Sequence, residues 1–133
     1  MRLSGKNAII TGAGSGFGKG IAKKFAKEGA NLILGDINFH KVEEVAKEFD
    51  QDCYQVDVSK SDSVKAFSEY AIKKYKEIHI VVNNAGITHL PMPLEDLSEE
   101  EFDKVFAVNA KSVFFSGKYF VPHMKSIGQG AIL

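Results

Sequence analysis

Glycines dominate the stretch from Thr11 to Gly18, which reads Thr-Gly-Ala-Gly-Ser-Gly-Phe-Gly. An apolar run, residues 8–10, precedes this stretch, and a segment with helical periodicity follows it. The pattern predicts a tight turn from a strand into a helix. Glycine permits unusual backbone angles and carries no Cβ, while a helix N-terminus offers unpaired N–H groups and positive dipole charge. Together these properties favour the binding of a phosphate group.

The spacing of the glycines narrows the class of ligand. The dinucleotide fingerprint Gly-x-Gly-x-x-Gly fails, because its third glycine would fall on Phe17 or Lys19. A nucleoside-triphosphate loop fails too, since no Gly-Lys-Ser or Gly-Lys-Thr follows at the required distance. The pattern Thr-Gly-x-x-x-Gly-x-Gly does fit, with Thr11, Gly12, Gly16 and Gly18. For the glycines alone, a flexible surface turn is an equal alternative.

A carboxylate stands at the end of the next predicted strand. Asn31–Gly35 is an apolar run, and Asp36 follows it, about twenty residues after the glycines. At that spacing an acidic residue hydrogen-bonds the ribose hydroxyls of an adenosine, and its charge repels a 2′-phosphate. Asp36 therefore favours NAD, with NADP the weaker candidate. Two alternatives stay open: a simple turn aspartate, and a phosphate accommodated by Lys41 and the basic residues after the glycines.

Polar residues also follow the third and fourth predicted strands. Asp57-Val58 ends the run Cys53–Val58, where the carboxylate could accept from an adenine amino group or serve as a turn or capping residue. Asn83-Asn84-Ala85-Gly86 follows the strongly apolar run Ile78–Val82. Two amides leaving a buried strand need partners, and Ala-Gly lets the backbone approach a ligand. An ordinary Asn-Gly-type turn is the alternative.

Asn109 interrupts an apolar stripe on a long predicted helix. The residues expected to face inward are Phe102, Val105, Phe106, Val113, Gly117 and Phe120. A buried amide in such a stripe must find partners. Asn109 is therefore expected either to take part in chemistry or to hold a neighbouring piece of backbone.

The elements that position these residues alternate between strand and helix. Strands are expected at 7–11, 31–35, 53–58, 78–82 and 131–133. Between them lie a helix with Phe17, Ile21 and Phe25 on its inner face, one capped by Asn38, one opened by a Ser59–Asp62 capping box, and one from the Ser98–Glu101 box to about Lys125. This order predicts an α/β fold, a doubly wound parallel sheet built from right-handed βαβ units. We expect residues 1–133 to be one dinucleotide-binding domain, the N-terminal part of a longer one, because the chain stops as the fifth strand starts.

Composition excludes several classes of protein. Lys+Arg and Asp+Glu both number 17, so no basic surface favours nucleic acid. No apolar run has the length of a membrane span, and the N-terminus has no signal-peptide layout. The single cysteine, Cys53, is compatible with a reducing compartment, so the cytoplasm is expected. No metal site is expected, because His40, His79, His89 and His123 lack ligand spacing.

The glycine pattern, Asp36, Asp57 and Asn-Asn-Ala-Gly, in this order, resemble the short-chain dehydrogenase/reductase family over the whole chain. The resemblance implies a Rossmann fold, here apparently truncated after the start of its fifth strand. It implies cofactor contacts from Gly12, Ser15, Gly16, Phe17, Gly18, Asp36, Ile37, Asp57, Val58, Asn84, Ala85 and Gly86. It also implies that Asn109, in the sequence Val-Asn-Ala, helps to hold a water molecule in a catalytic proton relay.

The resemblance further implies hydride transfer between a nicotinamide cofactor and an alcohol or carbonyl substrate, with a 3-oxoacyl group the commonest choice. Such enzymes use a serine, a tyrosine, a lysine and an asparagine. Only the asparagine is matched here, so the 133 residues alone are expected to be inactive. A non-catalytic dinucleotide-binding sensor is the alternative. An S-adenosylmethionine-dependent transferase ranks last, since its Gly-x-Gly-x-Gly loop usually follows an acidic residue where this chain has Ile10.

Two further expectations concern the helices. Tyr70 and Lys74 have the family's Tyr-x-x-x-Lys spacing but precede Asn-Asn-Ala-Gly, so we interpret them as an exposed helical pair. The helix at 99–125 has a second apolar flank formed by Val108, Phe115 and Tyr119. A helix that is apolar on two sides is buried on two sides. We expect this flank to meet either another subunit or a further part of the domain. The family's usual contact through this helix favours the first and implies a homodimer or homotetramer.

Overall fold

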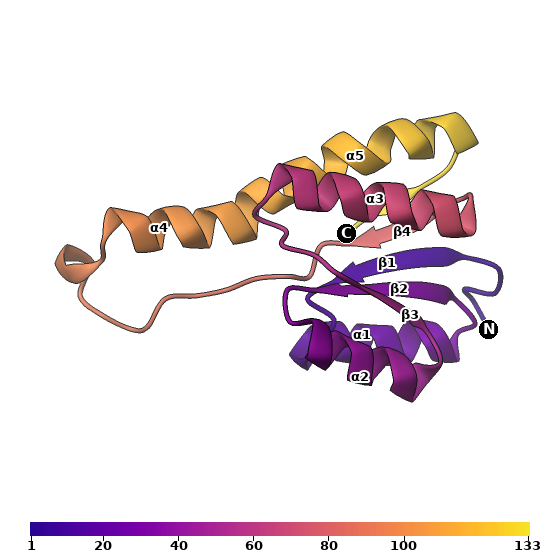
Figure 1. The fold of residues 1–133 in the computed structure, drawn as a ribbon, viewed down its shortest axis with the longest axis horizontal. Coiled ribbons are helices and arrows are strands. Elements are labelled where there is room, and N and C mark those ends of the chain that lie inside the picture. The colour runs from indigo at the N-terminus through magenta and orange to yellow at the C-terminus, as the bar shows by residue number, and fades with distance from the viewer.

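The computed structural model describes residues 1–133 and contains one parallel sheet with the strand order β3-β2-β1-β4-β5 (Figure 1). The strands are β1 (Asn7–Thr11), β2 (Asn31–Asp36), β3 (Asp52–Gln55), β4 (Ile80–Val82) and β5 (Ala131–Ile132). The predicted doubly wound α/β fold is confirmed, including the fifth strand, which pairs with β4. The reversal of direction in the strand order falls between β1 and β4, where such folds bind ligands.

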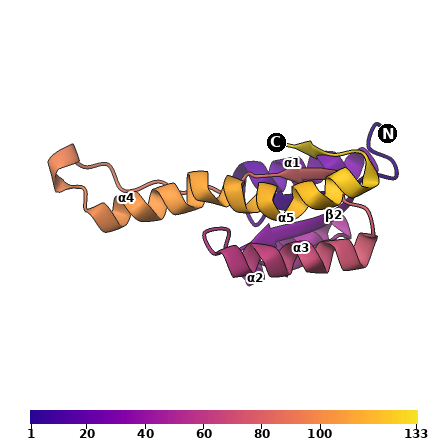
Figure 2. The same cartoon turned by 90° about the horizontal axis from the view of Figure 1, so that it is seen from above.

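Helices cover both faces of the sheet. The helices α1 (Gly16–Lys27) and α2 (Phe39–Phe49) lie on one face, and α3 (Ser61–Tyr75) and α5 (Ser112–Ile127) lie on the other (Figure 1). The helix α4 (Glu99–Phe106) extends past the sheet, and both views show it projecting away from the other elements (Figures 1 and 2). None of the helices is both long and apolar enough to span a bilayer.

The strands are apolar throughout because both faces of the sheet are covered. In β1, Ala8 and Ile10 belong to the core beneath α1 and α2, while Ile9 between them belongs to the core beneath α3 and α5. In β2, Leu34 and Ile33 divide between the two cores in the same way. Since strand side chains alternate between faces, a sheet buried on both sides requires an unbroken apolar run.

Local hydrogen bonds set the helix boundaries. The Asn38 side chain accepts from the Lys41 backbone and begins α2, and a complete capping box between Ser98 and Glu101 begins α4. The capping box predicted at Ser59 and Asp62 is wrong. Here α3 begins at Ser61 without a side-chain cap, because the Ser59 hydroxyl donates to the Asp57 carboxylate instead.

Two other predicted elements also differ from the structure. The third strand ends at Gln55 rather than Val58, because residues 57–59 form a turn held by the Asp57 carboxylate. The long helix is not continuous, since a π-helical segment, Ala107–Lys111, separates α4 from α5. The Ser112 hydroxyl donates to the Val108 carbonyl within this segment, a type of bond that disturbs regular helical hydrogen bonding.

The predicted inward face of the long helix is right at Phe120, which is buried, but wrong at three of its large apolar residues. Phe102 and Phe106 are more than half exposed, and Val113 is exposed. The two phenylalanines lie in α4, which extends beyond the sheet (Figure 2); we call α4 and the π-helical segment, residues 99–111, the arm. The flank assigned to a partner instead packs within this chain: Phe115 is buried, and the Tyr119 hydroxyl lies 2.6 Å from that of Ser61 on α3. The buried residues of α5 form its seam with the rest of the chain, and two of them are serines: Ser112, Phe115, Ser116, Phe120 and Met124.

The inner face of α1 also differs at its first turn. Phe17 was expected to face inward with Ile21 and Phe25, but its side chain is 89% exposed. The buried residues of this helix are Gly18 and Ala22, which let α1 lie close to the sheet. Ile21 and Phe25 pack only partly against the core, while the apolar side chain of Phe17 stands in the open beside the glycine turn.

Candidate functional site

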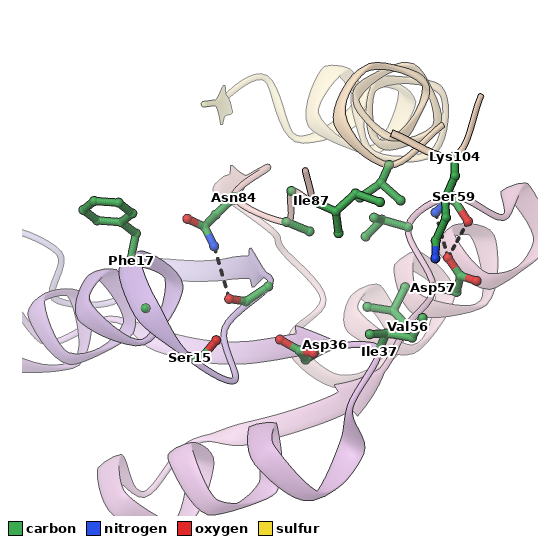
Figure 3. A pocket seen from close by; sticks show the side chains of 16 residues that line it. Ser15, Phe17, Asp36, Ile37, Val56, Asp57, Ser59, Asn84, Ile87 and Lys104 are labelled. Carbon is green, nitrogen blue, oxygen red and sulfur yellow. Dashed lines mark hydrogen bonds between the residues drawn. The ribbon is translucent and has the colours of Figure 1, made fainter. Parts of the chain in front are cut away.

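A cavity of about 600 Å³ lies at the carboxyl edge of the sheet, where the strands β1, β2, β3 and β4 end (Figure 3). Most of the residues predicted to contact a cofactor line it: Gly12, Ser15, Gly16, Phe17, Asp36, Ile37, Asp57, Val58, Asn84, Ala85 and Gly86. Gly18 and Asn109 do not line it. The topology therefore brings together residues from the ends of all four strands, as the order of motifs predicted.

The glycines have separate structural tasks. Gly12 and Gly16 adopt positive φ angles of 65° and 53°, which side chains rarely permit. A Cβ on Gly12 would lie 2.8 Å from the Ala85 Cα, and a Cβ on Gly18 would lie 2.6 Å from the Asn84 side-chain nitrogen. Gly12 and Gly18 thus allow close packing between the glycine turn and the segment after β4. Around Gly16 the space is open, on the side of the cavity.

The N-terminus of α1 opens into the cavity. Ser15 is its N-cap, yet its side chain makes no capping hydrogen bond, and no acidic residue stands in the first turn. The first N–H groups of a helix have no partners within the helix itself. Ser15, Gly16 and Phe17 all line the cavity, so these donors and the positive end of the helix dipole are available to an anion there.

The segment after β4 is tied to the end of β1. The Asn84 side chain donates to the carbonyl oxygens of Thr11 and Gly12, at 3.0 and 3.2 Å. The Ala85 backbone N–H donates to the Thr11 hydroxyl at 3.1 Å. Asn84 therefore forms one wall of the cavity and also fixes the glycine turn, whereas the buried side-chain nitrogen of Asn83 has no partner.

Two carboxylates, Asp36 and Asp57, also line the cavity. Asp36 accepts from the backbone N–H of Gly14 through one oxygen and from that of Asn38 through the other, both at 2.9 Å. Asp57 accepts from the backbone N–H and the hydroxyl of Ser59 through the same oxygen. Asp57 is thus a turn residue, one of the two roles considered for it, while its other oxygen has no hydrogen bond.

Asn109 lies in the π-helical segment and is exposed, so the expectation that it is buried is wrong. The reason is that the helix covers the sheet only from α5 onward, which begins after this residue (Figure 1). Its side chain makes two hydrogen bonds to the backbone of Ile87: it accepts from the N–H at 2.8 Å and donates to the carbonyl at 2.7 Å. Asn109 therefore holds a neighbouring piece of backbone, which attaches the arm to the loop after β4.

Several residues of the cavity wall were missed in the sequence: Val56, Ser59, Lys104 and Val108. Lys104 and Val108 come from the arm, and Figure 3 shows Lys104 on the side of the cavity opposite Ser15 of the glycine turn. Their i, i+4 spacing places them on one helical face, which was the available signal. Lys104 is the only cationic residue of the wall, and it makes no salt bridge.

Tyr70 and Lys74 lie outside the cavity. The Tyr70 hydroxyl donates to Asp52 at 2.6 Å, and the Lys74 ammonium lies 2.7 Å from the same carboxylate oxygen. Partial burial acts to raise the pKa of Asp52, but the hydrogen bonds from Lys74 and Tyr70 outweigh it and hold that pKa below its usual value. The bond to Asp52 raises the pKa of Tyr70 and of Lys74. The pair is bound to a structural carboxylate, with Lys74 exposed and Tyr70 half-buried.

No three His, Cys, Asp or Glu side chains lie close enough together to share a metal ion. Two of the histidines instead accept hydrogen bonds from the backbone. His79 is buried and accepts from the N–H of Asn7, and His123 accepts from the N–H of Ile78, both at 3.0 Å.

Solved structures with the same fold contain nicotinamide cofactors. A 3-ketoacyl-(acyl-carrier-protein) reductase from Brucella melitensis, complexed with NADH, is 43% identical with a TM-score of 0.92, over 95% of this chain and 52% of that one. A metagenomic short-chain oxidoreductase in complex with NADP is 31% identical with a TM-score of 0.94, over 99% and 62% of the two chains.

Relatives found by sequence also match this chain over about half of their own length. The 3-oxoacyl-[acyl-carrier-protein] reductase of Thermotoga maritima is 40% identical over 100% of this chain and 56% of its own length. Cyclohexanol dehydrogenase from an Acinetobacter species is 34% identical over 99% of this chain and 55% of its own length. The chain thus spans about half the length of these relatives. A family model described as short chain dehydrogenase matches residues 6–133. The chain therefore belongs to the short-chain dehydrogenase family.

Proposed function

We propose that the full-length protein is an NAD-dependent oxidoreductase that transfers a hydride between nicotinamide and a carbonyl or alcohol. Residues 1–133 form the N-terminal part of its single dinucleotide-binding domain. The observation that carries the proposal is the combination, in one cavity, of an uncapped helix N-terminus and the Asp36 carboxylate. The first suits a pyrophosphate and the second suits a ribose diol.

The residues present fit a dinucleotide along the sheet edge. The first turn of α1 would hold the pyrophosphate, Asp36 the adenosine ribose, and Ile37 and Val58 the two sides of the adenine, with Asp57 near its amino group. The exposed Phe17 and the segment Asn84–Gly86 would flank the nicotinamide half. When bound, the cofactor supplies the hydride acceptor or donor. The chain itself supplies binding, orientation and a wall against water.

We propose NAD rather than NADP because Asp36 carries a negative charge where an added 2′-phosphate would stand. Solved relatives bind NADH, NAD or NADP, so family membership alone does not select one. Lys104 is the one cation of the wall, but it comes from the arm, across the cavity from the glycine turn. The carboxylate at the end of β2 therefore supports the unphosphorylated cofactor.

Asn109 is proposed to serve the proton relay as a positioning residue. Its two hydrogen bonds to Ile87 fix the loop after β4 relative to the arm, and its carbonyl oxygen keeps a second acceptor site for a water molecule. A serine and a Tyr-x-x-x-Lys pair, which the family's chemistry requires, have no match here other than Tyr70 and Lys74 at the wrong place. Residues 1–133 alone should therefore bind cofactor without turnover.

A 3-oxoacyl group carried as a thioester is our proposed substrate class. Its support is that proteins named as 3-oxoacyl or 3-ketoacyl reductases are among the relatives in sequence and in structure. Cyclohexanol dehydrogenase is similar at a lower identity, so small secondary alcohols are the comparison class. We further propose a homo-oligomer formed through the exposed apolar side chains of α4 and α5, and a cytoplasmic location, which the single free cysteine suits.

Titration of NADH, NADPH and S-adenosylmethionine against the purified full-length protein tests the proposed function. We expect NADH to bind most tightly, and we expect Asp36→Ala to weaken NADH binding and narrow its advantage over NADPH. Selective binding of S-adenosylmethionine would overturn the proposal. Oxidation of NADH with a 3-oxoacyl thioester, compared with reduction of NAD by cyclohexanol, then distinguishes the two substrate classes, and a protein that binds NADH but turns over neither is a sensor.

A further inference from the structure

We propose that Gly14 is a specificity-determining residue, because its backbone N–H and its missing side chain position the Asp36 carboxylate for a ribose diol. The inference rests on the proposed function and adds a residue to it. Gly14 was not among the residues expected to contact the cofactor, and it does not line the cavity. It acts through Asp36 and is therefore a positioning residue.

The Asp36 carboxylate is held from two sides. The Gly14 N–H, in the glycine turn, donates to Oδ2 at 2.9 Å, and the Asn38 N–H, at the start of α2, donates to Oδ1 at 2.9 Å. These donors belong to two different loops at the ends of β1 and β2. The carboxylate cannot rotate about its last side-chain bond without losing both hydrogen bonds, which are stronger than neutral ones because the acceptor is charged.

The bonds leave a defined set of acceptor sites. An ionised carboxylate has about four lone-pair sites, two on each oxygen. One site on each oxygen is taken by a backbone N–H, so one site on each oxygen is left. Asp36 lines the cavity, and a vicinal diol presents two O–H donors side by side. A phosphate monoester presents only negative oxygens to the same place.

The missing side chain of Gly14 matters as much as its N–H. A Cβ at this position would lie 3.0 Å from Asp36 Oδ2, 3.1 Å from its Cγ and 3.1 Å from the Lys41 Cβ. The Lys41 backbone is fixed by its bond to the Asn38 cap, so the carboxylate is the group that must move. The φ of Gly14 does not lie in the left-handed region, so its backbone conformation is open to alanine.

The decisive experiment compares Gly14→Ala with Gly20→Ala in the full-length protein. A Cβ on Gly20 would meet nothing within 4 Å, so this variant controls for the loss of a glycine near the same turn. We expect Gly14→Ala to lower the ratio of NADH to NADPH affinity by about fivefold or more, through weaker NADH binding, with Gly20→Ala unchanged. An unchanged ratio in both variants would overturn the inference.

A double variant shows whether Gly14 acts through the carboxylate. In the Asp36→Ala background we expect Gly14→Ala to leave the ratio unchanged, because the group it positions is absent. A further fall of the ratio in that background would mean that Gly14 contacts the cofactor in another way, which contradicts the proposal. The conservative variant Asp36→Glu should have a ratio of NADH to NADPH affinity between those of Asp36→Ala and the unaltered protein. It keeps the negative charge, but its longer side chain displaces the carboxylate.

A measurement on the unaltered protein covers the case in which Gly14→Ala fails to fold. In ¹H–¹⁵N spectra, the amide resonances of Gly14 and Asn38 should move together when the pH is lowered from 7 to 3, and both should lose this response in Asp36→Asn. Independent behaviour of the two amides would overturn the inference. A protein that binds neither NADH nor NADPH would instead overturn the proposed function, whatever these amides do.

Discussion

The two walls of the cavity are built in different ways. On the sheet side, the side chains of Asp36 and Asn84 are both hydrogen-bonded to the backbone of residues 11–14, and the apolar residues of the strands beside them are buried. On the arm side, α4 buries no residue and exposes Phe102 and Phe106. The polar groups of the sheet wall are therefore held by contacts within these 133 residues, whereas the exposed phenylalanines of α4 are covered by none of them.

The arm is nevertheless part of the same site. Lys104 and Val108 line the cavity, and the Asn109 side chain joins the arm to Ile87 with two hydrogen bonds. The sheet-side wall is therefore fixed by contacts within this chain, whereas we expect the position of the arm to depend on what packs against α4. Substitutions on the sheet side should thus change the stability of the single chain, and those on the arm side should change association.

Among residues around the cavity, the largest effect is expected at Gly18. A Cβ there would overlap the Gly12 carbonyl oxygen and lie 2.6 Å from the Asn84 side-chain nitrogen, so the turn must shift. We expect Gly18→Ala to lower the free energy of unfolding by about 3 kcal/mol or more, measured by urea denaturation.

Gly20→Ala is the matched control in the same helix. It meets no neighbour and should raise the free energy of unfolding by up to about 1 kcal/mol, because alanine has the higher helix propensity. Equal effects of the two variants would mean that the close packing of the sheet wall is not what requires Gly18.

The difference between the walls also separates what could be predicted from the sequence. The positions of the strands and the grouping of motifs at the carboxyl edge of the sheet follow from apolar runs that end in polar residues, such as Leu34 before Asp36. These features depend on contacts within a few residues or between neighbouring strands. The Tyr70–Lys74 spacing was correctly set aside, because the pair lies outside the cavity and is bonded to Asp52.

The arm could not be predicted in this way. Phe102 and Phe106 have the period of a buried stripe, but periodicity reports only which face is apolar and not what covers it. The true seam of α5 includes Ser112 and Ser116, which polarity assigns to the outside. The backbone bonds to Asp36 involve the N–H groups of Gly14 and Asn38, and a main-chain donor leaves no mark in the sequence.

One asparagine on the sheet side and one in the arm give the next largest effect. Asn84 and Asn109 each make two hydrogen bonds to backbone groups, but Asn84 is partly buried and Asn109 is exposed. We expect Asn84→Ala to cost about 2 kcal/mol of unfolding free energy, because the carbonyls it leaves are shielded from water. Asn109→Ala should cost less than about 1 kcal/mol, since water can replace its side chain. Equal costs would contradict the contrast between the walls.

A smaller effect is expected at Asp52, on the sheet side but away from the cavity. Its pKa is lowered in the folded protein, so the ionised form contributes stability that is present above its unfolded pKa of about 4 and is lost as the pH falls below it. We expect Asp52→Asn to reduce stability at pH 7 and to flatten the loss of stability on acidification. Thermal unfolding from pH 3 to 7 measures this. If the Asp52→Asn variant lost stability between pH 7 and pH 3 as steeply as the unaltered protein, the bonds of Asp52 to Lys74 and Tyr70 would not contribute to the pH dependence of stability.

The smallest effect on the single chain is expected at Phe106 on the arm. Its side chain is 58% exposed, so Phe106→Ser should change the unfolding free energy of the monomer by no more than about 0.5 kcal/mol. The same substitution should weaken the proposed homo-oligomer, because apolar area leaves the interface. Light scattering during gel filtration, at several concentrations of the full-length protein, measures the shift toward smaller species.

Phe120→Ser is the matching substitution in α5, the helix that follows the arm and packs on the sheet (Figure 1). Phe120 is 2% exposed, and its loss should cost about 4 kcal/mol of unfolding free energy, a folding defect rather than an association defect. The two phenylalanines thus separate burial within these residues, seen at Phe120, from the burial between copies that we propose for Phe106. If Phe106→Ser destabilised the monomer as strongly as Phe120→Ser, the arm would have to fold back on its own chain, and α4 would not be an interface between copies.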